Sequence, residues 1–406
     1  MQHIKVLHIN TSGVGGAAIA CHRLHRLMLR AGLHSKVLHL YNNIPKDENF
    51  SFIGYSAFRR FTNHALYDIV HRDLKPDAYV FNEPAPISSG IANHPLLAEA
   101  DVIYLHWVLG GFFSKKDFEE VAQLGKPIFC FTHDMWWITG GCHYAFDCNG
   151  YKTGCKTCHL HKHFPWWTRS QATWKKEFYS QHPNIRFISP SDWLRKCTDA
   201  AYAVGTDRCD FIPNIVPDSI FHYIDKKVAR EHFDLPQNKT IVSFGTADNK
   251  NWVKGINYLV EALNSINNPQ LMLCVYGSDG DKELERQIKH PIRFLGRLCA
   301  EEVAFASAAA DVFVSPTIAE SFGQTLLENI KCGTPVISTR TTAVPEIVKD
   351  GINGFLVEPR NSKQLLCAIL NFISNPLKLD GSFNEIFSEQ SIIARHIEVI
   401  KKALLK

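Results

Sequence analysis

The sequence predicts an α/β protein made of two doubly wound domains with parallel sheets. Short apolar runs rich in β-branched residues recur along the 406 residues, separated by longer stretches with helical periodicity. This length is sufficient for two domains that each bury their own core. The composition agrees, because 45% hydrophobic and 21% charged residues are typical of a soluble globular chain.

Charge and hydropathy exclude several kinds of protein. The formal net charge of +4 is too small to predict nucleic-acid binding. No window of about twenty residues is free of charge, so we expect no membrane-spanning helix. The first residues, MQHIKVLHIN, run directly into a predicted strand and leave no room for a signal peptide. We therefore expect a cytoplasmic protein whose 12 cysteines are mostly reduced.

The first elements are a strand at residues 4–9, a helix at 17–31 and a strand at 37–41. Gly15 and Gly16, in the loop before the helix, would let a ligand or a second backbone come close. A bare structural turn explains such a loop equally well. The loop is not a G-x-G-x-x-G motif, and no acidic residue at the end of the second strand supports dinucleotide binding.

Residues 50–74 mix aromatic and basic side chains. The pattern fits a helix resting on an anionic membrane, and it fits better a helix packed on its own domain with a solvated basic face. Three tryptophans further along, Trp166, Trp167 and Trp174, are as typical of sugar stacking as of a core.

Four more strands are predicted in this half, at residues 101–106, 127–132, 185–190 and 209–213, with a helix near 115–124. The strand at 127–132 ends at His133 and Asp134, before the unusual segment DMWWITGGCHY. A lone histidine in such a place is usually structural, satisfied by a nearby carbonyl. The aromatic and glycine-rich segment that follows keeps a functional role open.

Four cysteines lie close together in the pattern C-x5-C-x6-C-x2-C: Cys142, Cys148, Cys155 and Cys158. Thiolates are good zinc ligands, and Cys155 with Cys158 would chelate from one turn. The first spacing is longer than in common zinc motifs, so plain thiols and disulfides remain alternatives. Four thiolates would close the coordination shell, which predicts a structural zinc and not a catalytic one.

In the second half, strands are predicted at residues 240–245, 271–276 and 293–298, and helices to about 265, at 300–310, 361–374 and 388–405. Lys254 stands at the start of a predicted helix, against the preference of the helix dipole. An anionic ligand would explain this position, and a solvated lysine is the alternative.

The most informative stretch is residues 311–357. A strand at 311–315, a helix at 322–331 and a strand at 335–338 form a βαβ unit whose loop lies where open sheets bind ligands. Glu320 precedes the helix, and Glu328 lies two turns inside it. The backbone amides of the loop (Ser321, Phe322 and Gly323) would meet phosphate or sugar oxygens. Alternatively, Glu320 caps the helix and Glu328 is a surface charge.

This stretch resembles the donor-sugar site of retaining GT-B glycosyltransferases, family 4 (glycosyl transferases group 1), of the polysaccharide-biosynthesis type. The shared features are Glu320 followed by Phe-Gly, Glu328 followed by C-G-T-P-V-I, and the later V-P-E and G-x-N-G-F-L-V segments. The resemblance is close in the C-terminal half and looser in the N-terminal half.

The resemblance implies two Rossmann-like domains facing a cleft. Residues 1–215 would form the acceptor side, with a Cys-rich insertion at about 140–163. Residues 216–387 would form the nucleotide-sugar side, and the helix at 388–406 would pack back on the N-terminal domain.

It also implies transfer of a sugar, with retention, from a nucleoside diphosphate sugar to a glycan or lipid-linked acceptor, without a catalytic metal or nucleic acid. Peripheral contact with the inner face of the membrane would suit a lipid-linked acceptor. The catalytic residues implied are Glu320, Lys254 on the diphosphate, and His133 on the sugar. The donor-binding residues implied are Glu328 on the ribose, Ser321, Phe322, Gly323, Thr325, Gly15, Gly16 and Arg297.

One position departs from the family pattern. Thr246 stands where the family commonly has an arginine, so a second cation for the diphosphate would be Lys250 or Arg297, or would be absent. This departure leaves room for a non-catalytic partner subunit that keeps the fold. A nucleotide-sugar epimerase is a further alternative, whereas a phosphorylase would need a pyridoxal phosphate lysine that nothing in the sequence singles out.

Overall fold

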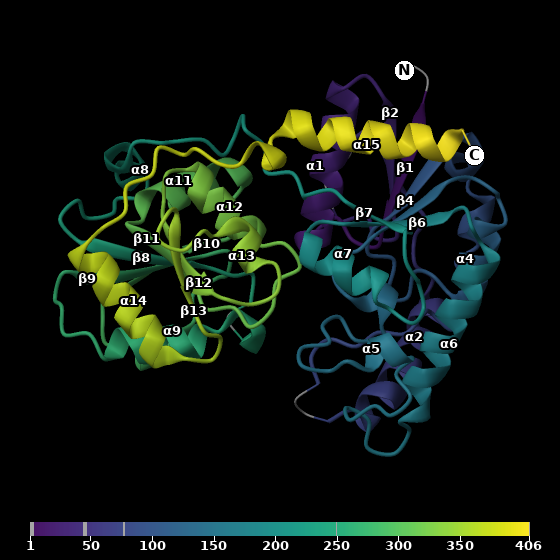
Figure 1. Cartoon of the computed structure of the whole chain (residues 1–406), viewed down its shortest axis with the longest axis horizontal. Helices are drawn as coiled ribbons and strands as arrows, with labels where there is room; N and C mark the ends of the chain where they lie inside the picture. The colour runs from purple at the N-terminus through teal and green to yellow at the C-terminus, as the bar shows by residue number, and fades with distance from the viewer. Residues whose placement is uncertain (1–3, 44–46, 76–77, 249, 406) are drawn as a thin grey trace. The chain divides into compact units, whose positions relative to one another are not determined.

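The computed structural model describes residues 4–43, 47–75, 78–248 and 250–405, so the first three residues of the MQHIKVLHIN segment lie outside it. The chain divides into two compact units, both drawn in Figure 1. Unit 1 comprises Met1–Ile215 with Gln390–Lys406, and unit 2 comprises Val216–Glu389. Each unit contains one parallel sheet with helices against it, which confirms the predicted fold class.

Unit 1 is built on a seven-stranded sheet in the order β3-β2-β1-β4-β5-β6-β7. Its side chains alternate between two apolar layers: Leu7 and Ile9 of β1 face one, and Val6 faces the other. The strands are β1 (Lys5–Asn10), β2 (His34–His39), β3 (Phe50–Phe52), β4 (Val102–Leu105), β5 (Ile128–Phe131), β6 (Ile185–Ser189) and β7 (Cys209–Phe211). The helices are α1 (Gly16–Arg30), α2 (Ala57–Asp73), α3 (Pro95–Glu99), α4 (Lys115–Ala122), α5 (Gly150–Thr153), α6 (Trp166–Gln181), α7 (Asp192–Asp199) and α15 (Glu389–Leu404), with short 3-10 turns η1 (Ile91–Asn93) and η2 (Trp136–Ile138).

Unit 2 has a six-stranded sheet in the order β10-β9-β8-β11-β12-β13. Helices α9 and α14 cover one face, and α8, α11 and α12 contribute apolar side chains to the other. The strands are β8 (Thr240–Gly245), β9 (Leu271–Tyr276), β10 (Ile292–Gly296), β11 (Val312–Ser315), β12 (Val336–Thr339) and β13 (Gly354–Val357). The helices are α8 (Lys226–His232), α9 (Ile256–Asn264), α10 (Lys282–Gln287), α11 (Ala300–Ala309), α12 (Gln324–Lys331), α13 (Val344–Ile347) and α14 (Ser362–Ser374), with 3-10 turns η3 (Trp252–Lys254) and η4 (Glu385–Phe387).

Strand order reverses once in each sheet, between β1 and β4 in unit 1 and between β8 and β11 in unit 2. The connections that leave these two neighbouring strands diverge to opposite faces of the sheet. A crevice therefore opens at the carboxyl ends of the strands, which is where doubly wound sheets bind ligands.

Several boundaries differ from the sequence-based prediction. Helix α12 begins at Gln324 and not at Phe322, because Gly323 adopts a left-handed conformation with φ of 96°. Glu328 therefore lies one turn inside the helix, not two. The short strand β3 was not predicted, and the tryptophan-rich stretch forms helix α6. Periodicity gave little sign of either element, since β3 has three residues and α6 is weakly amphipathic.

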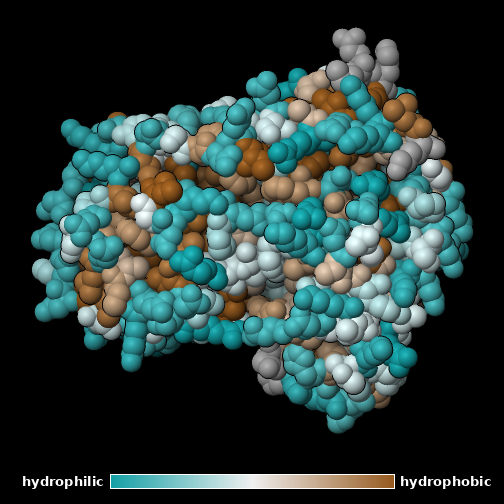
Figure 2. All heavy atoms as spheres, in the orientation of Figure 1, coloured by the Kyte–Doolittle hydropathy of each residue, from teal (hydrophilic) through white to brown (hydrophobic). Residues whose placement is uncertain are grey.

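Helix α15 belongs to unit 1, where Ile392 and Ile400 join the apolar layer beneath α1. His396 on this helix is buried, and its Nδ1 lies 3.2 Å from the Tyr104 hydroxyl of β4. The face in Figure 2 carries mainly hydrophilic side chains with hydrophobic ones interspersed. None of the helices in the described ranges is long and apolar enough to cross a membrane.

We predict that unit 1 loses stability in mild acid. Burial lowers the pKa of His25 and His133 to about 4 and that of His396 to about 3, below the ordinary 6.5. As the pH falls below 6.5, these histidines bind protons in the unfolded chain, whereas they stay neutral while buried in the folded chain. Each histidine of pKa near 4 should therefore lower the free energy of unfolding by about 2 kcal/mol at pH 5 relative to pH 7.5.

Urea unfolding followed by tryptophan fluorescence tests this, since all of the eight tryptophans but Trp252 lie in unit 1. Amide exchange in unit 2, which holds only His222, His232 and His290, supplies the internal reference. An equal loss of unfolding free energy in both units between pH 7.5 and 5 would contradict the prediction.

Candidate functional site

The principal site of unit 2 is an ion pair at the point where the strand order reverses. Lys254 comes from the loop after β8, and Glu320 comes from the loop after the neighbouring strand β11. The Lys254 Nζ donates to Glu320 Oε1 at 2.5 Å, and both side chains are largely buried. The structure thus brings together two of the predicted catalytic residues, which are 66 positions apart in the sequence.

Backbone contacts fix the loop that carries Lys254. Gly255 has φ of 74°, and a Cβ on it would lie 2.0 Å from the carbonyl oxygen of Pro316, so only glycine allows this approach. The amide of Ile318 donates to the Val253 carbonyl at 2.8 Å. Lys254 lies in the turn η3 before helix α9, not on the helix itself. Its predicted conflict with the helix dipole is therefore weaker than the sequence suggested.

A third loop holds Glu320. The amide of Glu320 donates to the Thr342 hydroxyl at 2.8 Å, and the amide of Ala343 donates to the Glu320 carbonyl at 3.3 Å. Thr342 adopts a left-handed φ of 44°, which is unusual for a β-branched residue. The loops after β8, β11 and β12 therefore converge on one residue, Glu320, through its carboxylate and its backbone.

The other predicted donor-binding residues of this loop and helix lie beside the ion pair in sequence but differ in exposure. Glu328 is only 5% exposed, so the alternative of a surface charge is wrong. Its carboxylate is close enough to raise the pKa of the buried Tyr276, in addition to the effect of burial. The Phe322 side chain is in the core, 6.0 Å from the ring of Phe387. Ser321 and Thr325 are partly exposed, and Gly323 caps α12.

The two residues considered as a second cation are both exposed in the structure. Arg297 is 77% exposed and lies 3.6 Å from the exposed carboxylate of Asp279. Lys250 is exposed. The hydroxyl of Thr246, the residue that replaces the expected arginine, donates to the Asp248 carbonyl at 2.9 Å within a local turn.

In unit 1, the loops after β1 and β4 are bonded to each other at the corresponding place. The amide of Trp107 donates to Asn10 Oδ1 at 2.9 Å, and that of Thr11 to the Trp107 carbonyl at 2.8 Å. Gly15 needs its φ of 97°, whereas Gly16 has ordinary backbone angles, and a Cβ on it would meet no other atom within 4 Å. The fold itself therefore gives no steric reason for glycine at residue 16.

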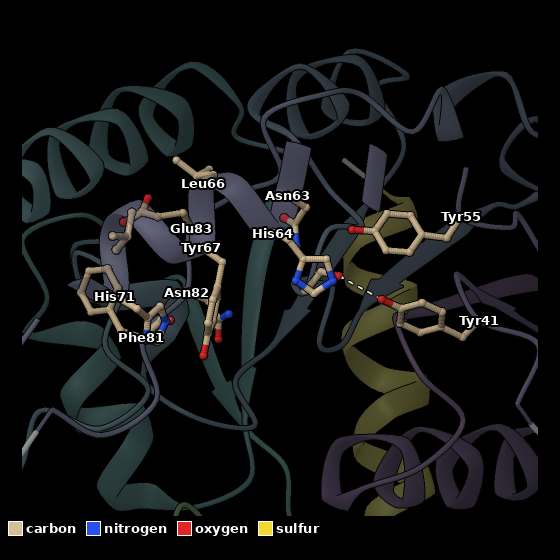
Figure 3. Close-up of a pocket in the computed structure, with 12 residues that line it drawn as sticks. Tyr41, Tyr55, Asn63, His64, Leu66, Tyr67, His71, Phe81, Asn82 and Glu83 are labelled. Atoms are coloured by element: carbon tan, nitrogen blue, oxygen red, sulfur yellow. Dashed lines mark hydrogen bonds between the residues drawn. The ribbon is translucent and has the colours of Figure 1, made fainter. Parts of the chain in front are cut away.

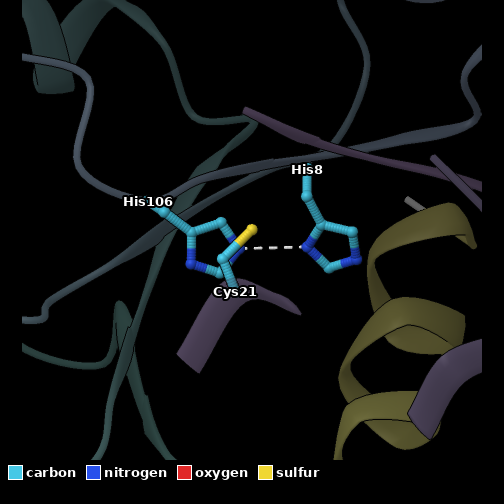
Figure 4. A group of neighbouring side chains, drawn as sticks. All are labelled: His8, Cys21 and His106. Atoms are coloured by element: carbon cyan, nitrogen blue, oxygen red, sulfur yellow. Dashed lines mark hydrogen bonds between the residues drawn. The ribbon is translucent and has the colours of Figure 1, made fainter. Parts of the chain in front are cut away.

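His133 is the end of a chain of three histidines, of which one lies on β1 and the other two follow the ends of β4 and β5. His8 Nδ1 lies 3.0 Å from His106 Nε2, a contact marked by the dashed line in Figure 4, and His106 Nδ1 lies 2.8 Å from His133 Nε2. Burial, and then neighbouring histidines, lower the pKa of His8 and His106 well below the ordinary value. All three rings are therefore neutral at pH 7, and each carries one proton.

Two hydrogen bonds in series couple the three tautomers. Each bond needs one donor and one acceptor, so the protons lie either on all three Nε2 atoms or on all three Nδ1 atoms. The Nε2 of His8 is buried without a partner, and a buried N–H without an acceptor is rarer than a bare acceptor. The Nδ1 arrangement is therefore favoured, and it makes His133 a donor at Nδ1.

Figure 4 also includes Cys21, because its sulfur lies within 4.8 Å of the two nitrogens of His8 and His106. Within the described ranges, this is the one group of three potential metal ligands at such spacing. We interpret these three residues as part of the hydrogen-bonded core and not as a metal site. The nitrogens already form a hydrogen bond, and burial raises the pKa of the Cys21 thiol, which disfavours the thiolate needed for a metal.

Two other polar residues order the segment after His133. Asp134 accepts from His143 Nδ1 at 2.6 Å and from the Trp136 amide at 2.8 Å. Burial raises its pKa, but His143 and this amide outweigh that effect and hold the pKa below its usual value. Buried Lys175 donates to the Thr139 carbonyl at 2.9 Å and lies 3.6 Å from the centre of the Trp136 ring. The sequence-based prediction did not single out Lys175, although it interrupts an aromatic stretch.

The four clustered cysteines approach one another without disulfides. The amide of Gly150 donates to Cys148 Sγ at 3.3 Å, and a Cβ on Gly150 would lie 3.8 Å from Cys155 Sγ. Burial, and then the thiols of Cys158, Cys155 and Cys148, raise the pKa of Cys142, so the four lie within electrostatic reach of each other. They are not spaced as closely as the three potential ligands of Figure 4.

The segment of unit 2 that contains the Lys254–Glu320 ion pair also matches a family of known proteins. Residues 238–375 match the family model described as glycosyl transferases group 1. The chain is 25% identical to a putative colanic acid biosynthesis glycosyl transferase, WcaC, of Escherichia coli K12, over 82% of each chain. An uncharacterized glycosyltransferase of Methanocaldococcus jannaschii is 34% identical over 30% of this chain, and the match spans 35% of that relative's length.

Solved structures match the whole chain in fold. Sucrose-phosphate synthase from Thermosynechococcus elongatus has a TM-score of 0.70 at 17% identity, over 98% of both chains. Anabaena HepE in complex with UDP-glucose has a TM-score of 0.60 at 19% identity, over 99% of this chain and 98% of that one. The chain is thus a homologue of group 1 glycosyltransferases, with two Rossmann-like domains and GT-B structural neighbours.

We predict that His106→Gln uncouples His133 from the chain of histidines, because glutamine has no group at the Nδ1 position. Long-range ¹H–¹⁵N spectra of histidine-labelled protein should show His133 as a single Nδ1–H tautomer before the change and as a mixture after it. His396→Gln is the matched control, since it removes a buried histidine whose hydrogen bond goes to Tyr104 and not to the three. A mixture at His133 in the unaltered protein would refute the coupling.

We propose that the four cysteines bind one structural zinc ion, which would draw their sulfurs together. Elemental analysis of purified protein should give about one zinc per chain. Cys155→Ser with Cys158→Ser should remove it and lower the melting temperature, whereas the exposed Cys367→Ser should do neither. Protein with only trace zinc after expression in zinc-containing medium would exclude the site.

Proposed function

We propose that this homologue of group 1 glycosyltransferases transfers a sugar, with retention, from a nucleoside diphosphate sugar to a glycan or lipid-linked acceptor. The observation that carries the proposal is the Lys254–Glu320 ion pair at the ligand-binding edge of unit 2. It lies inside the segment matched by the family model. The UDP-glucose complex of the structural neighbour HepE supports a nucleotide-sugar donor.

In this proposal, binding of the donor breaks the ion pair between Lys254 and Glu320. A diphosphate offers Lys254 more negative charge than one carboxylate, so Lys254 would move its hydrogen bond to a phosphate oxygen. Glu320 would then be released to accept hydrogen bonds from the sugar hydroxyls. Glu328 would accept from the ribose hydroxyls. The loop at Ser321, Phe322 and Gly323 and the nearby Thr325 would complete the contacts to the sugar and phosphates.

We propose a front-face reaction. The bond from the anomeric carbon to the phosphate oxygen breaks, and the acceptor oxygen bonds to the same face of that carbon. The acceptor proton passes to the departing phosphate, whose charge Lys254 stabilises. Such a route needs neither a protein nucleophile nor a metal ion.

Residues of unit 1 are also proposed to contact the sugar. His133 would donate from Nδ1 to a sugar oxygen, at its exposed edge, because the cavity that it lines within unit 1 measures only about 10 Å³. Gly15 and Gly16 would let the donor approach the backbone, which would explain a glycine that the fold itself does not require. Arg297 would have to leave Asp279 to reach the donor.

The acceptor and its cellular context are proposed from one relative and from the exposed side chains of unit 1. The likeness to WcaC favours a role in cell-surface polysaccharide biosynthesis. Helix α2 exposes Phe58, Phe61 and Ile69 by 66%, 72% and 59%, which would suit peripheral contact with a membrane and a lipid-linked acceptor. Trp166 of helix α6 is also largely exposed, in keeping with a stacking role.

A second candidate is a partner subunit that binds a nucleotide sugar without turnover. Thr246 favours it, since its side chain is part of a local turn where the family commonly has a phosphate-binding arginine. Lys254 alone would then hold the diphosphate, which is enough for binding but leaves less stabilisation for the departing charge.

We predict that Glu328→Gln and Lys254→Gln each weaken nucleotide-sugar binding about ten- to a hundredfold, the loss expected for one charged hydrogen bond. A thermal-shift screen with UDP-, GDP- and ADP-sugars, followed by titration calorimetry, measures this. Glu358→Gln is the control, because its exposed carboxylate lies outside the site, 3.9 Å from Arg340. Unchanged affinity in both variants would refute the donor site, and binding without turnover or slow hydrolysis would favour the subunit.

A further inference from the structure

Unit 1 contains two adjoining pockets that share Leu66 and Glu83. The first, called the aromatic pocket and drawn in Figure 3, measures about 220 Å³ and is lined by Tyr41, Tyr55, Tyr67 and Asn82 among others. The second, called the polar pocket, measures about 330 Å³, and its lining includes Ser114, Lys115, Trp167 and Gln171. The proposed mechanism uses neither pocket.

Polar atoms without partners gather at these two pockets. Among the described residues, fourteen buried side-chain polar atoms have no hydrogen-bond partner. Five of the fourteen belong to residues that line the two pockets: Tyr55 Oη, Glu83 Oε1 and Oε2, Trp167 Nε1 and Gln171 Oε1. An unmet buried polar group typically costs stability, so such a concentration indicates a place kept for a polar ligand.

Glu83 is central because it borders both pockets. Both of its carboxyl oxygens are buried, and burial raises its pKa to about 8. The Trp167 indole lies near enough to oppose that rise, yet the two groups lack hydrogen-bond geometry. Lys175 attracts the carboxylate from a distance, but its own ammonium donates to the carbonyls of Trp136 and Thr139. Glu83 is therefore not the hydrogen-bonded counter-ion of a structural lysine.

Neighbouring residues hold the aromatic wall of the first pocket in place. The rings of Tyr41 and Tyr55 meet edge to face with centroids 5.5 Å apart, and in Figure 3 both hydroxyls point toward the middle of the pocket. Arg59 lies over the Tyr55 ring at 5.3 Å. A Cβ on Gly111 would lie 1.9 Å from the Tyr55 hydroxyl, so only glycine at this position leaves space for it.

We propose that the two pockets bind consecutive sugar residues of an acceptor glycan, one in each pocket. Sugar hydroxyls both donate and accept, so one ligand would satisfy the Glu83 carboxyl, the Gln171 carbonyl and the Trp167 indole. The tyrosine rings would pack against the apolar face of a sugar ring. This inference rests on the proposed function, since it assigns the acceptor to unit 1 as a glycan of at least two residues.

A glycan array of linear oligosaccharides, probed with the labelled full-length chain, tests the proposal. We expect binding to oligosaccharides, and calorimetry should give the best disaccharide at least tenfold higher affinity than its component monosaccharides. Glu83→Gln should weaken that binding about tenfold and Trp167→Phe about threefold, as expected for lost hydrogen bonds. Trp193→Phe, in the same unit but outside both pockets, should leave it unchanged.

Thermal unfolding separates a ligand site from a structural role. If Glu83 serves a ligand, Glu83→Gln should keep or raise the melting temperature while it lowers glycan affinity. A melting temperature lowered together with unaltered glycan binding would overturn the proposal, as would the absence of binding anywhere on the array. Glycan binding without any shift by UDP-, GDP- or ADP-sugars would uphold these pockets and count against the donor site.

Discussion

Both units depend on one constraint: a parallel sheet covered on both faces leaves only the strand ends for polar chemistry. The strand interiors are mainly apolar, with a few buried polar residues such as His8 and Ser243, and the charged pair of unit 2 lies in loops at the carboxyl edge. The reversal of strand order then makes one place on that edge open. Lys254 and Glu320 occupy this place in unit 2, and His106 follows β4 at the corresponding place in unit 1. The topology determines the place that is open to a ligand, and the side chains at that place determine which ligand binds.

The Lys254–Glu320 pair also explains how unit 2 keeps charged groups ready at a partly buried edge. Removing either charge from water is costly, and a short contact between them offsets that cost while no anion is bound. A diphosphate carries more negative charge and more acceptor oxygens than one carboxylate, so it competes well for the lysine. Gly255 and Thr342, with their left-handed backbones, hold the two loops close enough for this contact.

The sequence predicted the elements that local periodicity specifies, such as β8, β9 and β11 in unit 2. It predicted Lys254 and Glu320 as site residues, but their contact depends on strand pairing between β8 and β11, which no local pattern encodes. The sequence-based prediction began α12 two residues too early. The side chains before Gln324 fit a helical pattern, but the left-handed conformation of Gly323 prevents the helix from starting there. The connection from His8 through His106 to His133 was invisible for the same reason as the ion pair, since it needs three strands in register.

Both units contain buried polar atoms without a hydrogen-bond partner, and in unit 1 five of these atoms belong to residues that line the two pockets sharing Glu83. Around the ion pair of unit 2, loops after three strands are bonded to one another, which would suit the diphosphate proposed for this place. In unit 1, Glu83, Trp167 and Gln171 have buried atoms without partners, and the buried His8 has one as well. Such groups lower the stability of a domain and persist where a ligand uses them. The unsatisfied groups around Glu83 therefore favour unit 1 as the part of the chain that selects the acceptor, whose hydroxyl pattern can be matched only by groups left open for it.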